Sequence, residues 1–285
     1  RVWLGSLIRL LEPLELNGRL VRTSVFRLGK EAWLRTETVG RRADYVLTDS
    51  GRRRFEEASR HIYAAQAPHW DRRWRLILAV GEFAPKERER LRRALFWQGF
   101  GVLGADCFVH PSADLNAAYD ALVAEGLTDY LARLMPLLAA DARSGLPAND
   151  ADLVARAWNL DALAGAYGEF VATYLPVLTE VRGDRLAEVA DEDAFLLRTL
   201  LIHDYRRLLL RDPELPDVLL PVDWPGEKAR RLCQELYRRL APASERHLDK
   251  FLTLADGSNP ACDPAYAARF SQEESQGNSL GGQTR

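Results

Sequence analysis

The stretch NGRLVRTSVFRLGKEAW, residues 17–33, decides how the rest of the chain is interpreted. Asn17 is a favourable helix cap, because its side chain can accept a hydrogen bond from a free amide of the first turn. Helical spacing gives an apolar face with Leu20, Ser24, Val25 and Leu28. The opposite face is cationic and has no acid; it holds Arg19, Arg22, Thr23, Phe26, Arg27 and Lys30. This second face suits a polyanion, although a solvated basic helix would show the same pattern.

The segments around this helix predict a winged helix. Residues 2–12 repeat apolar side chains at helical spacing, so two short helices, the second one basic, follow each other as in a helix-turn-helix. Residues 34–38 and 45–48 are rich in Thr, Val and Tyr, which favour strands. A glycine turn between them places Arg41 and Arg42 at the tip of a hairpin, where they can reach phosphates. A solvated loop is the alternative.

Composition and charge limit the class of protein and point to the first 60 residues for any contact with nucleic acid. The chain has 285 residues, enough for two or three domains, and no apolar run approaches the roughly 20 residues that span a bilayer. Its three cysteines lie far apart, which excludes a disulfide framework and a cysteine zinc site and fits a reducing cytosol. Residues 1–60 carry 13 Arg and Lys against 8 Asp and Glu, whereas the rest carry 26 against 33. We expect a basic head on an acidic body.

The middle of the chain predicts a small domain with a sheet and two helices. It follows a helix at residues 50–65, in which Phe55, Ala58 and Ile62 are expected to face inward. Strands are expected at residues 74–80, 101–110 (with a bulge at Gly104) and 130–138, and helices at residues 85–98 and 115–125. The resulting β-α-β-α-β order suggests a ferredoxin-like sandwich.

The last part of the chain predicts helices, which makes the fold class α+β. A polar segment at residues 139–151 marks a boundary, and apolar periodicity then indicates helices at residues 152–174, 191–211 and 224–241. The domains expected are a winged helix-turn-helix at residues 1–65, a linker at 66–73, a ferredoxin-like domain at 74–140, an all-helical effector and dimerisation domain at 141–270, and a flexible tail at 271–285.

Four motifs make the chain resemble the PaaX family of bacterial transcriptional repressors. VWLGSLIRLLEPL, VRTSVFRLGKEAWL and VGRRADYVLT lie in the head, and LIHDYRRLLLRDPELPDVLLPVDWPG begins at Leu201. The resemblance implies a winged-helix head, a central domain similar to the Cas2 ferredoxin-like fold, and a helical C-terminal domain. It further implies a repressor of phenylacetate catabolism genes that leaves its operator when phenylacetyl-coenzyme A binds.

Two departures from the family pattern concern the DNA-binding head. The family has a further helix before residue 1, so the head is expected to be incomplete in this sequence. Phe26 and Ala43-Asp44 replace smaller or uncharged residues. Phe26 can contact a thymine methyl group, whereas Asp44 is expected to repel phosphate. We therefore expect an operator sequence that differs from those of other members.

The titratable residues show no catalytic pattern. None of the five histidines is in HExxH or HxH spacing, and the sequence has no phosphate loop. His203, Asp204 and Tyr205 are adjacent on one predicted helix, so their side chains point apart. Glu82 and Asp106 lie near strand ends, but two lone carboxylates are weak evidence for Mg²⁺. We predict neither a catalytic site nor a metal site.

A group of aromatic and basic residues in the C-terminal part suggests a site for the effector. Its arginines match phosphates in fork geometry, and its rings offer surface to a phenyl or adenine group. The members are Trp158, Tyr167, Tyr205, Arg206, Arg207, Arg211 and Trp224. The alternative is that the rings are core residues and the arginines pair with nearby acids.

The leading hypothesis is a dimeric, ligand-responsive repressor of the bacterial cytoplasm, associated with the nucleoid when bound, that needs no cofactor. Arg19, Arg22, Thr23, Phe26 and Arg27 would read bases in the major groove, and Lys30, Arg41 and Arg42 would hold phosphates. Two enzyme alternatives remain open: a coenzyme A-thioester-processing enzyme, and a Mg²⁺-dependent nuclease built on the central domain. Turnover would indicate the first, and loss of activity without Glu82 or Asp106 would indicate the second.

Overall fold

The computed structural model describes residues 1–64, 66–140, 149–183 and 189–270. The tail expected at residues 271–285 and most of the boundary expected at 139–151 lie outside these ranges. The chain divides into two compact units. The first holds residues 1–65, 170–206 and 229–285, and the second holds residues 66–169 and 207–228. No helix in the described ranges is long and apolar enough to cross a membrane.

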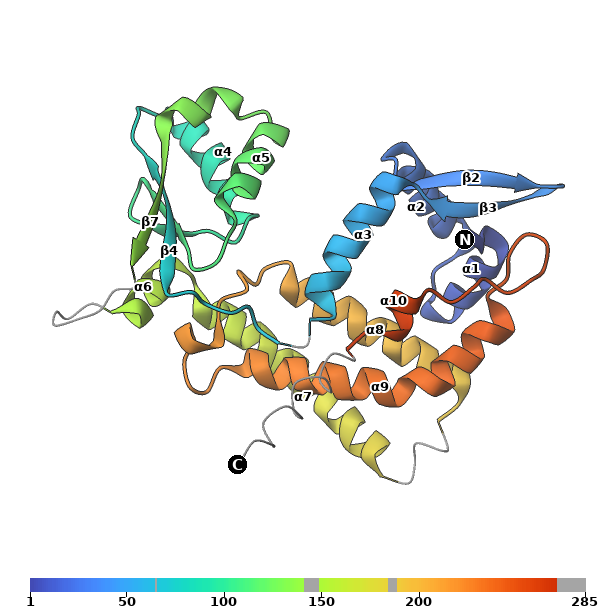
Figure 1. The fold of residues 1–285 in the computed structure, drawn as a ribbon. Coiled ribbons are helices and arrows are strands. Elements are labelled where there is room, and N and C mark those ends of the chain that lie inside the picture. The colour runs from blue at the N-terminus through green and yellow to red at the C-terminus, as the bar shows by residue number, and fades with distance from the viewer. Residues whose placement is uncertain (65, 141–148, 184–188, 271–285) are drawn as a thin grey trace, which may run out of the picture. The chain divides into compact units, whose positions relative to one another are not determined.

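The N-terminal residues of the first unit form three helices and a three-stranded antiparallel sheet (Figure 1). The elements are β1 Val2–Trp3, α1 Leu4–Leu11, the 3-10 turn η1 Glu12–Leu14, α2 Gly18–Lys30, β2 Leu34–Val39, β3 Arg42–Leu47 and α3 Asp49–Ile62. The strands lie in the order β1-β3-β2. Val39 pairs with Arg42, so Gly40 and Arg41 form the turn of the predicted hairpin.

The buried face of α2 differs from the prediction. Its buried residues are Val21 and Val25, which are 5% and 6% exposed. These two residues are four positions apart and form one narrow row on a helix that contacts α1 and β2. Because the row is so narrow, the other residues assigned to this face lie outside it and are exposed: Leu20, Ser24 and Leu28.

Helix α3 is also less buried than predicted. Phe55 and Ala58 are exposed, and Ile62 is half-buried. The guanidinium carbon of Arg269 lies 5.9 Å from the centroid of the Phe55 ring. A cation therefore lies beside this ring where an apolar neighbour was expected.

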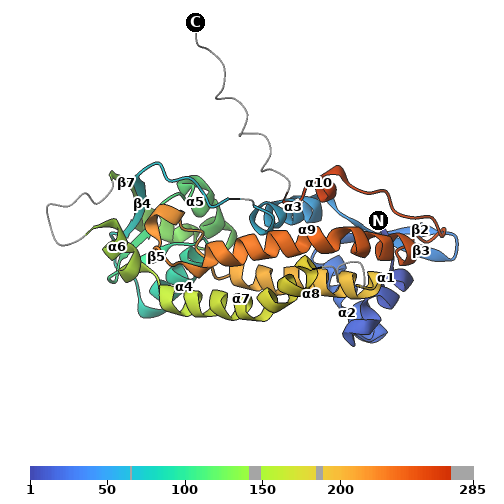
Figure 2. The ribbon, with the colours of Figure 1, turned by 90° about the horizontal axis from the view of Figure 1, so that it is seen from below.

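The C-terminal helices build the core of the first unit, in which α7, α8 and α9 lie side by side (Figure 2). The helices are α7 Leu160–Arg182, which enters this unit at Phe170, α8 Asp191–Leu209, α9 Pro225–Phe251 and α10 Pro264–Ala267. The predicted helix at residues 224–241 continues to Phe251 through Pro242. Proline removes one backbone hydrogen bond. Burial of Leu240 before it and of Ala243 after it stabilises the continuous helix.

The second unit is built on a four-stranded antiparallel sheet with the strand order β5-β6-β4-β7. Its elements are β4 Arg73–Ala79, α4 Pro85–Phe96, β5 Gly101–Leu103, β6 Cys107–His110, α5 Leu115–Ala124, the 3-10 helix η2 Thr128–Arg133 and β7 Leu134–Ala140. Helices α4 and α5 lie together on one face (Figure 1), over a core that includes Ile77, Leu91, Phe108 and Leu122. The order βαββαβ is that of ferredoxin-like domains.

Two segments of this sheet differ from the prediction. Residues 101–110 form a hairpin of two strands, because Gly104, with a φ of +67°, lies in a turn that reverses the chain instead of forming a bulge. Residues 128–133 form a 3-10 helix that contains Tyr130, so the last strand begins at Leu134. The sheet consequently has four strands where three were expected.

The other face of the sheet is covered by a short helix and the proline-rich loop. Helix α6, Asp150–Ala157, ends at Trp158, whose extended backbone separates it from α7. The single helix predicted at residues 152–174 is therefore two helices. Val154 of α6 and Leu215 of the loop pack with Trp74 of β4 in one apolar cluster.

Candidate nucleic-acid interface

Helix α2 presents the predicted cationic face to solvent. The Asn17 side chain accepts a hydrogen bond from the Leu20 amide at 2.9 Å, so the predicted cap is confirmed. All six residues assigned to the cationic face are exposed: Arg19, Arg22, Thr23, Phe26, Arg27 and Lys30. Within the described residues, no carboxylate forms an ion pair with the arginines or the lysine of this face. The face can therefore offer its charge to an external anion.

Two contacts within the helix orient its exposed side chains. The Thr23 hydroxyl donates to the Arg19 carbonyl at 2.9 Å. The Lys30 ammonium lies 5.0 Å from the centroid of the Phe26 ring, which is 63% exposed. A cation over an aromatic face stabilises both groups weakly at an exposed site. Phe26 is thus an exposed apolar contact surface in the middle of the cationic face.

The two arginines of the hairpin differ in their surroundings. Gly40 has a φ of +60° and Arg41 beside it is exposed. The guanidinium carbon of Arg42 lies 4.5 Å from the centroid of the Trp3 ring, which orients its side chain. Arg9 of α1 approaches the same ring at 5.8 Å. Arg9 is a neighbouring cation that sequence reasoning missed, because only the tertiary contact with Trp3 places it beside the hairpin.

The expectation that Asp44 repels phosphate is wrong. Asp44 is 1% exposed, and its two oxygens accept hydrogen bonds from the Ala255 amide at 2.7 Å and from Arg1 at 3.2 Å. The Trp3 amide and the Ser6 hydroxyl both donate to the Thr253 carbonyl, each at 3.0 Å. The carboxylate therefore attaches the hairpin to the segment that follows α9, and its charge is neutralised internally.

The structure brings together only part of the proposed effector group. Tyr167 and Trp224 make an edge-to-face contact with ring centroids 6.0 Å apart, and the Tyr167 hydroxyl donates to Asp212. Trp158 belongs to a different contact, in which its indole nitrogen donates to the Gly99 carbonyl at 3.1 Å. This places Trp158 in the packing against β5.

The other members of the effector group are distributed over both units. Tyr205 is buried against Phe170 in the first unit, with ring centroids 5.6 Å apart. Three arginines of the group are exposed: Arg206, Arg207 and Arg211. His203 is exposed as well, while the Asp204 carboxylate accepts from Tyr174 at 2.8 Å. His203 thus lies apart from the contacts that Asp204 and Tyr205 make with α7.

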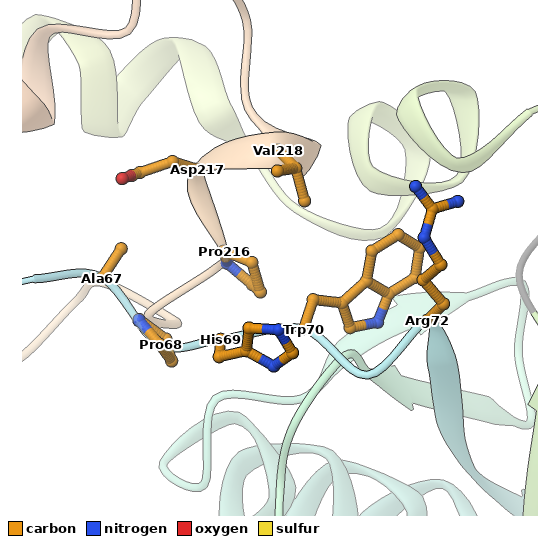
Figure 3. Close-up of a pocket in the computed structure, with 8 residues that line it drawn as sticks. All are labelled: Ala67, Pro68, His69, Trp70, Arg72, Pro216, Asp217 and Val218. Carbon is orange, nitrogen blue, oxygen red and sulfur yellow. The ribbon is translucent and has the colours of Figure 1, made fainter. Parts of the chain in front are cut away.

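A pocket of about 390 Å³ lies between residues 67–72 and the proline-rich loop (Figure 3). The indole of Trp70 and the guanidinium of Arg72 line it from one side, and Pro216 and Val218 line it from the other. None of the residues proposed for the effector lies in its lining. The carboxylates considered for Mg²⁺ are also apart from it: Asp106 pairs with Arg88 at 3.1 Å.

The comparisons with known proteins agree with the order of these parts. Family models match residues 1–51 as PaaX-like protein, residues 67–141 as the PaaX protein central Cas2-like domain, and residues 158–250 as the PaaX-like protein C-terminal domain. The chain is also 36% identical, over 272 residues, to a protein of Escherichia coli (strain K12); the match covers 94% of this chain and 84% of that protein. The chain belongs to the PaaX family. The E. coli member is named transcriptional repressor PaaX.

Membership of the PaaX family confirms the resemblance seen in the sequence motifs. It also confirms an α+β chain with a Cas2-like central domain and a helical C-terminal part. A solved structure, the uncharacterized protein Rv0674 from Mycobacterium tuberculosis, superposes with a TM-score of 0.54. The two chains are 22% identical, and the match covers 85% of this chain and 89% of that chain. At this identity the likeness shows a shared fold.

Proposed function

We propose that this PaaX-family protein is a transcriptional repressor whose N-terminal head is a winged helix that binds double-stranded operator DNA. The observation that supports this most directly is the cationic face of α2, which is exposed and forms no ion pair with an acid of the described part of the chain. The name of the E. coli relative supports a regulator over the two enzyme alternatives. In such heads a helix enters the major groove while neighbouring segments contact the backbone.

The proposed roles follow from the position of each side chain. Five residues of α2 would reach base edges: Arg19, Arg22, Thr23, Phe26 and Arg27. Arginine can bind guanine in bidentate fashion, and an apolar ring can contact the thymine methyl group. Three further cations would hold phosphates and fix the register: Lys30, Arg41 and Arg42.

The remaining parts of the proposal concern partners and organisation. The protein would act as a homodimer in the cytoplasm, because two-fold operators are matched by two-fold proteins. Phenylacetyl-coenzyme A would release it from DNA by binding the DNA-incompetent arrangement more tightly. The proposed effector residues are Trp158, Tyr167, Tyr205, Arg206, Arg207, Arg211 and Trp224. The proposed boundaries are a head at residues 1–65, a linker at 66–73, a central domain at 74–140 and a helical part at 141–270.

Replacing Arg22 by alanine should weaken operator binding about tenfold at fixed salt, since a lost arginine contact costs about 1–3 kcal/mol. The measurement is a fluorescence-anisotropy titration of labelled upstream DNA. Arg156→Ala removes an exposed arginine of α6 and is the matched control, expected to bind as the wild type does. Equal loss in both variants would contradict a specific role for α2 and indicate only a general charge effect.

Phenylacetyl-coenzyme A should dissociate the complex with upstream DNA, whereas free phenylacetate at the same concentration should not. The salt concentration is kept constant, because phosphate contacts make the affinity depend steeply on salt. Tight DNA binding that neither compound changes would support the repressor and contradict phenylacetyl-coenzyme A as its effector. Absence of DNA binding even at low salt would overturn the proposed function itself.

A further inference from the structure

Strand β7 is an edge of the central sheet, with β4 as its neighbour on one side. Its sequence, LMPLLAA, contains no charged residue. Met135, Leu137 and Leu138 are 46%, 39% and 60% exposed. Among the described residues, none pairs with its outer edge. Exposed edge strands usually carry a charged residue, a proline or a bulge that hinders association, and of these β7 has only Pro136.

The direction of the free backbone groups follows from the pairing register. Val80 lies opposite Arg133, and its amide donates to the Arg133 carbonyl at 2.9 Å. Hydrogen-bonded pairs alternate along an antiparallel ladder. The even-numbered residues of β7 therefore direct their amides and carbonyls away from β4. These residues are Leu134, Pro136, Leu138 and Ala140.

This arrangement makes the edge complementary to itself. If a two-fold axis passes beside Leu138, the Leu138 amide and carbonyl of one chain meet those of the other. The Ala140 amide then meets the Pro136 carbonyl of the second copy, two residues away on each side. Pro136 has no N–H to donate, so each Pro136–Ala140 pair forms one hydrogen bond instead of two and leaves one Ala140 carbonyl to solvent. The apposed side chains are all apolar and bring no like charges together.

We propose that β7 pairs antiparallel with β7 of a second copy and joins the two central sheets into one. The inference rests on the proposed function, because it names the surface through which the proposed homodimer forms. An uncharged edge with self-matching donors and acceptors favours a second copy over an acidic or basic partner. The two-fold axis passes through the midpoint between the two Leu138 residues.

Leu138→Pro tests the backbone pairing, because it removes one outward amide while leaving the β4 ladder intact. The measurement is sedimentation velocity of the full chain over a concentration series. We expect the dimer dissociation constant to rise at least tenfold, with an unchanged thermal midpoint. Leu138→Val keeps the amide and is the matched control, expected to dimerise as the wild type does. An unchanged dissociation constant in Leu138→Pro, or a wild-type chain that is monomeric at 100 μM, would overturn the proposal.

Leu138→Cys gives a positive test that does not depend on weakening the dimer. Facing residues of a hydrogen-bonded pair have Cα atoms about 5.5 Å apart, which is within the roughly 4.4–6.8 Å of disulfides. In a Cys262→Ser background, which removes the exposed native thiol, mild oxidation should cross-link Leu138→Cys and leave the exposed control Val80→Cys monomeric. No cross-link would contradict the proposal. DNA binding measured on the same wild-type sample separates failure of this interface from failure of the repressor assignment.

Discussion

Replacing Asp44 by alanine should lower the free energy of unfolding by about 3 kcal/mol, because the buried Ala255 amide loses its acceptor and Arg1 loses a partner. Hydrogen bonds to a charged group contribute about 1.5–3 kcal/mol each, and a buried donor left unsatisfied costs about 1–3 kcal/mol. The measurement is urea denaturation followed by circular dichroism. Operator affinity should fall together with stability, since the hairpin that holds Arg41 and Arg42 loses its attachment.

Two further variants separate the buried contact from a general loss of charge. Asp44→Asn keeps an oxygen that can accept from the Ala255 amide and should cost clearly less than Asp44→Ala. Glu37 also pairs with Arg1, at 3.3 Å, but its side chain is 29% exposed. Glu37→Ala should therefore cost less than about 1 kcal/mol. If Asp44→Ala unfolds at the same urea concentration as Glu37→Ala, the attachment does not stabilise the head.

Lowering the pH from 7.5 to 5 should destabilise the second unit by about 2 kcal/mol through His110 alone. This residue is 6% exposed, and its Nδ1 accepts from the Ser112 amide at 3.0 Å and the Ala113 amide at 2.7 Å. The proton of the neutral ring is therefore on Nε2, which lies 3.2 Å from the Pro213 carbonyl. Burial is the main cause that lowers the pKa of His110 from 6.5 to about 4; Arg75 lowers it further, while the Pro213 carbonyl and Glu214 oppose the shift.

The sign of this pH effect follows from the lowered pKa. The folded protein resists protonation, so the stability due to the neutral ring is complete above pH 6.5 and is lost as the pH falls toward 4. His110→Gln should show a shallower decline in unfolding free energy between pH 7.5 and 5 than the wild type. His69→Gln replaces an exposed histidine and should keep the wild-type decline. Parallel curves for the wild type and His110→Gln would contradict the prediction.

The sequence predicted some features that depend on local spacing correctly, although it did not predict the buried faces of α2 and α3. The Asn17 cap depends only on neighbours within one helical turn, and the cap was predicted correctly. The prediction of one strand at residues 101–110 was wrong because a glycine in an apolar run is compatible with a bulge and with a turn. The prediction of one long helix at residues 152–174 was wrong because periodicity does not reveal the break at Trp158 and Asn159.

In the candidate site, too, features set by local spacing were predicted and features set by distant partners were not. Exposure of the cations on α2 follows from helical periodicity and was predicted correctly. The burial of Asp44 was missed, because its amide partner is 211 residues away in the sequence. The neighbours of the effector residues were not predicted for a related reason: Trp158, Tyr167 and Tyr205 each have their own tertiary contacts, which composition alone does not specify.

The attachment of the hairpin to residues 253–255 limits how this protein can be cut into fragments. A peptide of residues 1–65 would contain every side chain proposed to contact DNA. It would lack the amide that binds the Asp44 carboxylate and the carbonyl that pairs with Trp3. A fragment that keeps these contacts would have to join the N-terminal segment to the segment after α9, because truncation at residue 65 removes them.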